Sequence, residues 1–423
     1  MGERIASPPP SQGVKLDFDT VVVGAGPIGS AVARDIARAG YQVLLLEEHA
    51  SIGTPCHCSG LVTPRTLEVA GVSEDVVINR IRGAIVHCMS GAQLPLRGDR
   101  VHALAIDRIA FDQQLAQQAT DSGAVLWLQA RLIDIDRGKD CMRLTVRRGK
   151  EEVTVNARLI VGADGARSTV AERVGYSPDC EYIQALGAEA SVTVEPLDMV
   201  HVYVGHEIAP HWFGWAIPLG RRRARIGTGQ GNSGAVPLKG LLDGLIEAFP
   251  QQFADADVSH YYGGAIPIYA PVRTYDDNLL LVGDAARQVK PTSGGGVYTG
   301  LVAARHCADA AIYALRHKDY TRHSLSRYEA AWRAALGPEL ERGLELRKVF
   351  ASLSDRDFHR LLSMLNRPQA QRVITRYGDI DSPSLMFGHL LRVSPRLLTL
   401  IHVPLRPRVI MPLLRLAARR NAR

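Results

Sequence analysis

Three glycines near the start of the chain have the spacing that a dinucleotide site requires. Gly24, Gly26 and Gly29 follow an apolar run predicted to be a strand and precede a helix predicted over residues 30–39. The first glycine permits a tight turn, the second lets the backbone approach a pyrophosphate, and the third lets the helix pack closely on the strand. The helix start offers free N–H groups to the phosphates. Glu47 closes the next apolar run, where its carboxylate can accept hydrogen bonds from ribose hydroxyls, so this segment predicts a bound dinucleotide.

The composition is that of an ordinary soluble globular chain, and its length suits two or three domains. Of its 423 residues, 46% are hydrophobic and 22% are charged. Residues 1–16 are rich in proline and serine and are expected to form a flexible arm, because they lack the apolar core of a signal peptide. No stretch approaches the ~18 apolar residues of a membrane-spanning helix.

The cysteines are few and scattered. With no export signal, the six cysteines favour a reduced, cytoplasmic setting. The tight spacing of Cys56, His57 and Cys58 could suggest a metal. A zinc site, however, needs about four ligands, usually from two such clusters, and no second cluster is visible. The sequence therefore predicts no metal.

The basic charge is concentrated at the C-terminus. The chain has a formal charge of +7, but residues 356–423 hold 13 arginines, no lysine and three aspartates, which amounts to +10 and leaves −3 for the rest. Apolar runs at 397–401 and 410–414 lie among these arginines, a mixture that suits the surface of an anionic membrane. A helical cap with a solvated arginine face is the open alternative. Nucleic-acid binding is not expected, since the segment matches no recognised module.

The pattern of apolar residues divides the chain into discontinuous domains. Three segments combine apolar strands, glycine-rich turns and helices. They are separated by segments of alternating polar and apolar residues, which predict an antiparallel sheet. This interruption argues against a simple dehydrogenase with one nucleotide domain followed by one catalytic domain. The predicted nucleotide domain is 17–75, 101–175 and 277–316, the antiparallel domain is 76–100 and 176–276, and the C-terminal helical, basic region is 317–423.

Three further motifs lie downstream of the glycine turn. Arg108 opens a predicted helix, Gly162-Ala163-Asp164-Gly165 ends a strand, and Gly283-Asp284 ends a later strand before Gly294-Gly295-Gly296. In this order the motifs resemble the flavoprotein superfamily of para-hydroxybenzoate hydroxylase type, in which they build an FAD site. The resemblance implies an α/β fold with a discontinuous, Rossmann-like FAD-binding domain of glutathione reductase type. It also implies an inserted, mainly antiparallel substrate domain and a C-terminal helical region.

Each motif has a physical role in such a site. Arg108 can neutralise a pyrophosphate with its planar donor fork. Asp284 can accept hydrogen bonds from ribitol or ribose hydroxyls. The helix expected to begin near Val297 can direct its N–H groups at the pyrimidine edge of a flavin and stabilise the charge of its reduced form. The resemblance further implies that the backbone of Ala130 meets the adenine.

A second nucleotide site is not expected. The glycine-rich stretch 227–234 is followed by no acidic strand end, so no permanent NAD(P) domain is predicted. An external reductant must then visit transiently. The sequence leaves open whether it is NAD(P)H, ferredoxin or a reduced quinone.

Two more motifs narrow the family. One is the loop Pro55-Cys56-His57-Cys58-Ser59-Gly60, and the other is the strand Phe213-Gly214-Trp215-Ala216-Ile217-Pro218 with a glycine-rich strand after it. Together they resemble the geranylgeranyl reductase family, particularly its archaeal-type branch of digeranylgeranylglycerophospholipid reductases. In that family Cys58 matches the loop cysteine and Gly60 a flavin-proximal glycine. Phe213 stands where tyrosine is usual and Ile217 where phenylalanine is, so the strand also resembles the Trp-x-Trp-x-Ile-Pro of flavin-dependent halogenases.

The resemblance implies reduction of isolated C=C bonds in a geranylgeranyl or other polyprenyl chain. Hydride from reduced flavin reaches one carbon and a proton the other, and alignment and water exclusion must supply much of the catalysis because the alkene is unactivated. The residues expected to take part are Cys58, Trp215 and Phe213. Cys58 could donate the proton, gate the flavin or be a small buried hydrophobe. The two aromatic residues could line a tunnel or simply pack in the core.

The sequence thus predicts an FAD-dependent oxidoreductase of CH–CH groups, in the cytoplasm at the inner face of the cell membrane. A flavin-dependent monooxygenase or halogenase is one alternative. A flavin-bearing protein that carries polyprenyl lipids without turnover is another. The predicted cofactor-binding residues are Gly24, Gly26, Ile28, Gly29, Glu47, Cys58, Gly60, Arg108, Ala130, Asp164, Asp284, Gly295, Gly296 and Val297.

Overall fold

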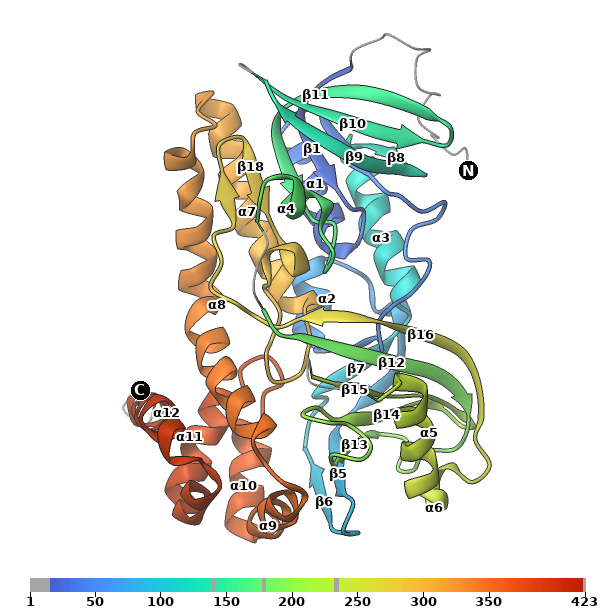
Figure 1. Cartoon of the computed structure of the whole chain (residues 1–423), viewed down its shortest axis with the longest axis vertical. Helices are drawn as coiled ribbons and strands as arrows, with labels where there is room; N and C mark the ends of the chain where they lie inside the picture. The colour runs from blue at the N-terminus through green and yellow to red at the C-terminus, as the bar shows by residue number, and fades with distance from the viewer. Residues whose placement is uncertain (1–15, 139–140, 177–179, 232–235, 421–423) are drawn as a thin grey trace.

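The computed structural model describes residues 16–138, 141–176, 180–231 and 236–420. The predicted N-terminal arm lies outside the described residues, except for Leu16 at the start of the first strand. Figure 1 shows one sheet near the top, a second sheet below it and a column of helices along one side.

The α-helices are α1 (Pro27–Arg38), α2 (Pro64–Ala70), α3 (Arg108–Asp121), α4 (Thr169–Arg173), α5 (Leu238–Ala248), α6 (Pro250–Phe253), α7 (Val297–His317), α8 (Arg322–Ala351), α9 (Asp355–Leu365), α10 (Pro368–Tyr377), α11 (Ser384–Val393) and α12 (Arg406–Arg420). The short 3-10 helices are η1 (Glu74–Val76), η2 (Gly283–Ala286), η3 (Pro395–Leu400) and η4 (Val403–Leu405).

The first sheet is parallel at its centre. Val21 pairs with Leu44 on one side and with Ile160 on the other. The central apolar run 43–46 is buried throughout, as a parallel strand covered on both faces requires. The path of the sheet runs β17 (Tyr275–Asp276), β18 (Leu279–Leu281), β11 (Glu151–Gly162), β1 (Leu16–Val23), β2 (Val43–Leu46) and β8 (Val125–Trp127), and β9 (Ala130–Arg137) and β10 (Met142–Arg148) extend β11 as an antiparallel meander.

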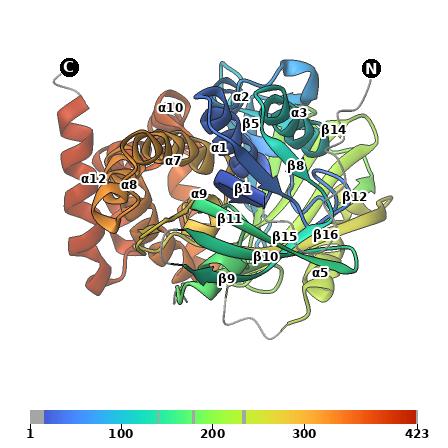
Figure 2. The same cartoon turned by 90° about the horizontal axis from the view of Figure 1, so that it is seen from above.

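Different structures cover the two faces of this sheet, as Figure 2 shows. Val22 packs on the side of α1, α3 and α7, whereas Val21 and Val23 pack towards the meander and α4. Successive residues of a strand point to opposite faces, so both faces draw on the same short apolar runs. Helix α1 begins at Pro27, three residues before the predicted start, because proline is well accepted at the first helical position.

The second sheet is antiparallel except where β13 lies beside β5. Its outer face, with Ala188 and Ile226, is covered by Leu242 and Leu245 of α5. Its inner face carries Trp215 of the predicted aromatic strand and Gly227 of the predicted glycine-rich strand, which pair with each other. The order is β16 (Asp257–Pro267), β12 (Tyr182–Ser191), β15 (Arg223–Gln230), β14 (Gly214–Gly220), β13 (Met199–Val204), β5 (Gly83–Cys88) and β6 (Gln93–Arg97). A small third sheet contains β3 (Leu61–Val62), β7 (Ala103–Ile106) and β4 (Val77–Ile81).

Helices α9 to α12, with η3 and η4, form a C-terminal helical cap beside the second sheet (Figure 1). Leu362, Leu390 and Leu413 of the cap pack with Leu94 of β6. Within the described ranges, no helix has both the length and the apolar character needed to cross a bilayer. The predicted fold class, an α/β architecture with an inserted antiparallel sheet and a C-terminal helical region, is confirmed.

Candidate active site

The glycine turn after β1 forms a cradle in which side chains would not fit. Gly24 has φ +98°, and a Cβ there would lie 2.5 Å from the carbonyl oxygen of Ala163. A Cβ on Gly29 would lie 1.9 Å from the carbonyl oxygen of Gly24. In contrast, no described atom lies within 4 Å of the Cβ position of Gly26, at the N-cap of α1. The turn is therefore closely packed at Gly24 and Gly29 but open at Gly26, where a pyrophosphate would approach.

Glu47 lies at the end of β2, next to this turn. One carboxylate oxygen accepts a hydrogen bond from the Ala25 N–H at 3.1 Å, and the other accepts from the His49 N–H at 3.0 Å. The Ala130 N–H donates to the Glu47 carbonyl oxygen at 2.8 Å. The structure thus brings together Glu47 and Ala130, two predicted residues more than eighty positions apart.

Ile28 connects the glycine turn to the late strand end. A Cβ on Gly283 would meet the Ile28 side chain at 3.3 Å, and one on Gly300 would meet it at 2.6 Å. The residues after β18 form η2 rather than continuing as a strand. Asp284 lies in η2, and its Oδ1 is 2.7 Å from the Cβ position of Gly296, the N-cap of α7. The first and last motifs of the chain therefore meet at one place, with Val297 as the first residue of α7.

Asp284 and Arg108 place opposite charges in this site. Burial raises the pKa of the Asp284 carboxyl, while Arg108 and Arg287 oppose that change. The Arg108 guanidinium donates two hydrogen bonds to Asp112, at 3.1 and 3.0 Å. Burial, the largest single influence, acts to lower the pKa of Arg108, but the Asp112 carboxylate and the thiols of Cys58 and Cys56 together outweigh it and raise the pKa. Arg108 therefore keeps a full positive charge in a mostly buried position.

Asp164 differs from the expectation for a cofactor contact. Its two carboxylate oxygens accept hydrogen bonds from the Ser168 hydroxyl at 2.6 Å and from the Val170 N–H at 3.0 Å. These bonds fix the turn into α4. Its part in cofactor binding stays a prediction, because the carboxylate already has partners within the protein.

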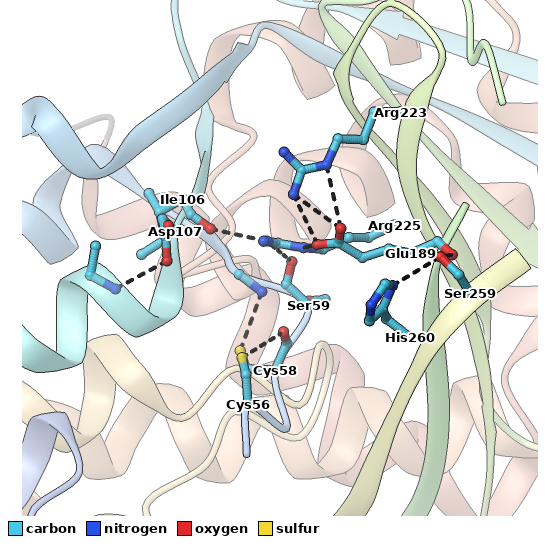
Figure 3. A network of polar contacts seen from close by, with 12 residues as sticks. Cys56, Cys58, Ser59, Ile106, Asp107, Glu189, Arg223, Arg225, Ser259 and His260 are labelled. Atoms are coloured by element: carbon cyan, nitrogen blue, oxygen red, sulfur yellow. Dashed lines mark hydrogen bonds and ion pairs between the residues drawn. The ribbon is translucent and has the colours of Figure 1, made fainter. Parts of the chain in front are cut away.

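The cysteine loop is held in place by Arg225, a residue that the sequence analysis did not single out. Arg225 of β15 donates from Nη1 to the carbonyl oxygens of Ser59 and Ile106, both at 2.9 Å (Figure 3). Gly60 has φ +68°, and a Cβ there would lie 2.3 Å from this nitrogen. The Gly60 N–H donates to the sulfur of Cys58 at 3.4 Å. Cys58 is half-buried. The thiol of Cys56 lies against its carbonyl oxygen, and burial raises the pKa of the Cys56 thiol.

The aromatic strand β14 and its neighbours form an aromatic wall. Trp212 and Phe213 stack with their ring centroids 4.7 Å apart. A Cβ on Gly229 would lie 2.7 Å from the Trp212 ring, and one on Gly227 would lie 2.2 Å from the Trp215 ring. The glycine-rich stretch that lacks a nucleotide signature thus has another purpose, because it lets tryptophans lie flat on the sheet.

An apolar cavity of about 460 Å³ begins beside this wall. One end is lined by Leu61, Phe213 and Ser293. Leu61 directly follows the cysteine loop, Phe213 directly precedes β14, and Ser293 lies in the loop before α7. The cavity continues between the second sheet and the C-terminal helical cap, where Met386 and Leu413 line it. It therefore joins the predicted flavin-facing loops to the cap.

Comparisons with known proteins identify the family. The sequence model of the FAD binding domain family matches residues 17–334. Digeranylgeranylglycerophospholipid reductase 2 of Methanopyrus kandleri is 33% identical over 374 residues, which are 85% of this chain and 93% of that protein. The digeranylgeranylglycerophospholipid reductase of Methanocaldococcus jannaschii is 30% identical, over 82% of this chain and 90% of that protein. This chain belongs to the digeranylgeranylglycerophospholipid reductase family.

Solved structures agree on the fold. A geranylgeranyl bacteriochlorophyll reductase-like protein from Thermoplasma acidophilum superposes with a TM-score of 0.80 at 24% identity, over 92% of this chain and all of that one. A flavin-dependent brominase superposes with a TM-score of 0.67 at 16% identity, over 90% of this chain. At these identities the likeness shows only the shared architecture. The sequence relatives favour the reductase over the halogenase and over a non-catalytic carrier.

The cofactor of this chain is FAD, and the site fits it. The cradle at Gly26 is open to a pyrophosphate, and Arg108 supplies a positive charge close enough to act on the Asp284 carboxyl. Asp284 offers a carboxylate that has no hydrogen-bonding side chain in the described part of the protein. When reduced, FAD supplies a hydride; the protein's share is to hold the cofactor, exclude water and deliver a proton.

Proposed function

We propose that this chain saturates C=C bonds in the geranylgeranyl chains of a lipid. The observation that carries the proposal is the apolar cavity, which runs from the cysteine loop and aromatic wall into the C-terminal helical cap. A polyprenyl chain held there would lie mostly against leucine, phenylalanine and methionine side chains, which exclude water from much of its surface. Such shielding suits a reaction whose substrate offers no polar group near the reacting bond. The names of the family relatives support the same substrate class.

The test is anaerobic reduction of the purified holoenzyme, followed by addition of geranylgeranyl phospholipid and mass spectrometry of the lipid. The expected result is a gain of two hydrogens for each saturated bond, with one reduced flavin consumed per bond. Reduced flavin that persists with unchanged lipid contradicts the proposal. Lipid that stays unchanged without oxygen but is hydroxylated or halogenated when oxygen is admitted to a parallel sample would assign the chain to the alternative flavin chemistry.

The predicted residues take distinct parts in this proposal. Gly24, Gly26, Gly29 and Glu47 hold the adenine nucleotide half of FAD, and Ala130 contacts the adenine. Arg108, Asp284 and the start of α7 at Gly295, Gly296 and Val297 hold the flavin half. Phe213 and Trp215 guide the polyprenyl chain past the cysteine loop, where Cys58 and Gly60 face the flavin. The support for these roles is the convergence of all these segments on one site.

The C-terminal helical cap is proposed to rest on an anionic membrane surface. Val393 and Met411 are large apolar residues that are 41% and 50% exposed, and exposed Arg396, Arg406 and Arg415 lie close to them in the chain. Arginines attract acidic headgroups, and each basic residue near the surface adds about 1 kcal/mol to membrane binding. The exposed apolar side chains between them can insert among the lipids. A membrane-bound cap would give the cavity access to lipid.

Vesicle sedimentation tests this placement. The variant with Arg396, Arg406 and Arg415 changed to glutamate should bind vesicles of anionic lipid much more weakly than the unchanged protein. Substitution is a better test than truncation, because Leu397 and Leu413 of the same segment are buried and their removal would disturb the fold. Equal sedimentation of both proteins would contradict the membrane contact.

We further propose that the reductant, NAD(P)H, ferredoxin or a reduced quinone, reaches the flavin from outside the chain.

A further inference from the structure

Two buried polar atoms on the inner face of the second sheet face one another without partners. They are the hydroxyl oxygen of Tyr262 on β16 and the indole nitrogen of Trp215 on β14. Among the described residues neither atom forms a hydrogen bond of ordinary geometry, although the Trp215 indole is close enough to the Tyr262 hydroxyl to act on its pKa. A buried hydroxyl without a partner costs about 1–3 kcal/mol, so such a pair points to a use.

The strand register explains how these two side chains come together. Tyr262 pairs with Gly187, Gly187 pairs with Gly227, and Gly227 pairs with Trp215, so the four residues form one row across four strands. A Cβ on Gly187 would lie 2.4 Å from the Tyr262 ring, and one on Gly227 would lie 2.2 Å from the Trp215 ring. The two glycines leave the middle of the row empty, and the two rings lie over it from opposite sides.

The row faces the cysteine loop. Burial is the largest influence on the Tyr262 phenol and raises its pKa, while the nearby Arg225 guanidinium and the Trp215 indole act to lower it. The thiols of Cys58 and Cys56 are also close enough to affect it. The Tyr262 phenol therefore holds its proton more tightly than a free tyrosine, and the positive charge of Arg225 and the Trp215 indole both favour its phenolate.

We propose that Tyr262 is the proton donor for alkene reduction, an inference that rests on the proposed function. An isolated C=C bond has no carbonyl on which negative charge could rest, so the proton must arrive before or together with the hydride. One C–H bond forms with the hydride and its electron pair from reduced FAD. The second forms as the Tyr262 O–H bond breaks, and the resulting phenolate, held by Arg225 and Trp215, regains a proton from water. The alkene is reduced by two electrons, and FAD is oxidised by the same two.

The experiment compares Tyr262→Phe with Tyr261→Phe in the holoenzyme. Tyr261 is the next residue on the same strand, but its side chain is 49% exposed and lies against Lys239. The rate at which substrate reoxidises the reduced flavin should fall about 10²- to 10⁴-fold in Tyr262→Phe and stay unchanged in Tyr261→Phe. FAD affinity and binding of a fully saturated lipid analogue, measured by calorimetry, should be unchanged in both variants, which separates proton delivery from a role in binding.

The pH profile distinguishes Tyr262 from Cys58 as the donor. With Tyr262, the rate should not fall as pH rises through the usual thiol range near 8.5. A rate that falls there, or a Tyr262→Phe variant that keeps its rate, would overturn the inference. If the unchanged enzyme itself leaves geranylgeranyl lipid unsaturated, the proposed function fails instead, so the two failures are distinguishable.

Discussion

Lys290 and Asp381 form a buried ion pair that ties the loop before α7 to the C-terminal helical cap. The Lys290 Nζ lies 2.7 Å from Asp381 Oδ1, and the side chains are 9% and 1% exposed. The other oxygen of Asp381 accepts hydrogen bonds from the Thr63 hydroxyl at 2.6 Å and from Arg65 at 3.1 Å. One carboxylate of the basic C-terminal segment thus fastens the cap to both sides of the cofactor site.

Replacing Asp381 with asparagine should loosen the cap. Lys290 would then be a buried charge without a counter-ion, which costs about 3–5 kcal/mol. Thermal unfolding followed by calorimetry should show a large drop in Tm. The matched control is Asp198→Asn, which removes an ion pair with Arg97 on the surface and should cost less than about 1 kcal/mol.

The double variant Lys290→Met with Asp381→Leu separates charge from packing. If the loss in Asp381→Asn comes from the unpaired lysine, the double variant should recover much of the stability, since apolar residues of similar size often replace buried ion pairs without penalty. A double variant as unstable as the single one would show that the hydrogen bonds to Thr63 and Arg65 matter more than the lysine.

The sequence predicted the parts of the site that depend on local chain geometry. The turn at Gly24 and the helix start near Val297 depend on glycine conformation and on a helix signal within a few residues, and both lie where they were expected. Tyr262 and Arg225 were missed because their roles depend on strand register, which pairs residues far apart in the sequence. Covariation between β12, β15 and β16 is the signal that could have found them.

A pair of stacked histidines predicts acid lability. His87 and His201 are buried, and His87 Nε2 lies 3.0 Å from His201 Nδ1. Burial, followed by the neighbouring His201, lowers the pKa of His87 from 6.5 to about 4. Between these values the unfolded chain binds a proton that the folded chain does not, so stability falls as pH falls through this window. The loss should reach about 3 kcal/mol near pH 4.

The variant His87→Phe should reduce this dependence. Phenylalanine keeps a ring beside Tyr203, which stacks on His87 with centroids 4.9 Å apart, but it cannot titrate. The difference in Tm between pH 7.5 and pH 5 should be smaller in His87→Phe than in the unchanged protein, while His323→Gln, at an exposed site, should leave it the same. An undiminished difference would place the acid sensitivity elsewhere.

Gly187→Ala should disturb the row that holds Tyr262. The new methyl group would lie 2.4 Å from the tyrosine ring, so the ring must move away from Trp215. Overpacking of this kind costs about 1–3 kcal/mol, and alkene reduction should fall as in Tyr262→Phe. Gly240→Ala in α5, where no described atom lies within 4 Å of the Cβ position, should change neither stability nor rate for the worse. Full activity of a folded Gly187→Ala protein would show that the ring position is unimportant.

The cavity wall should set the length of chain that the enzyme accepts. Met386 of α11 lines the cavity within the C-terminal helical cap, and a tryptophan there would fill part of the 460 Å³. We expect Met386→Trp to raise KM or abolish turnover for geranylgeranyl lipid while a lipid with shorter prenyl chains is still reduced. Met411→Trp, at a half-exposed position of α12 outside the lining, is the matched control and should leave chain-length preference unchanged. Equal loss for short and long chains in Met386→Trp would mean that the polyprenyl chain does not extend into the cap, and the substrate would then have to lie along the aromatic wall alone.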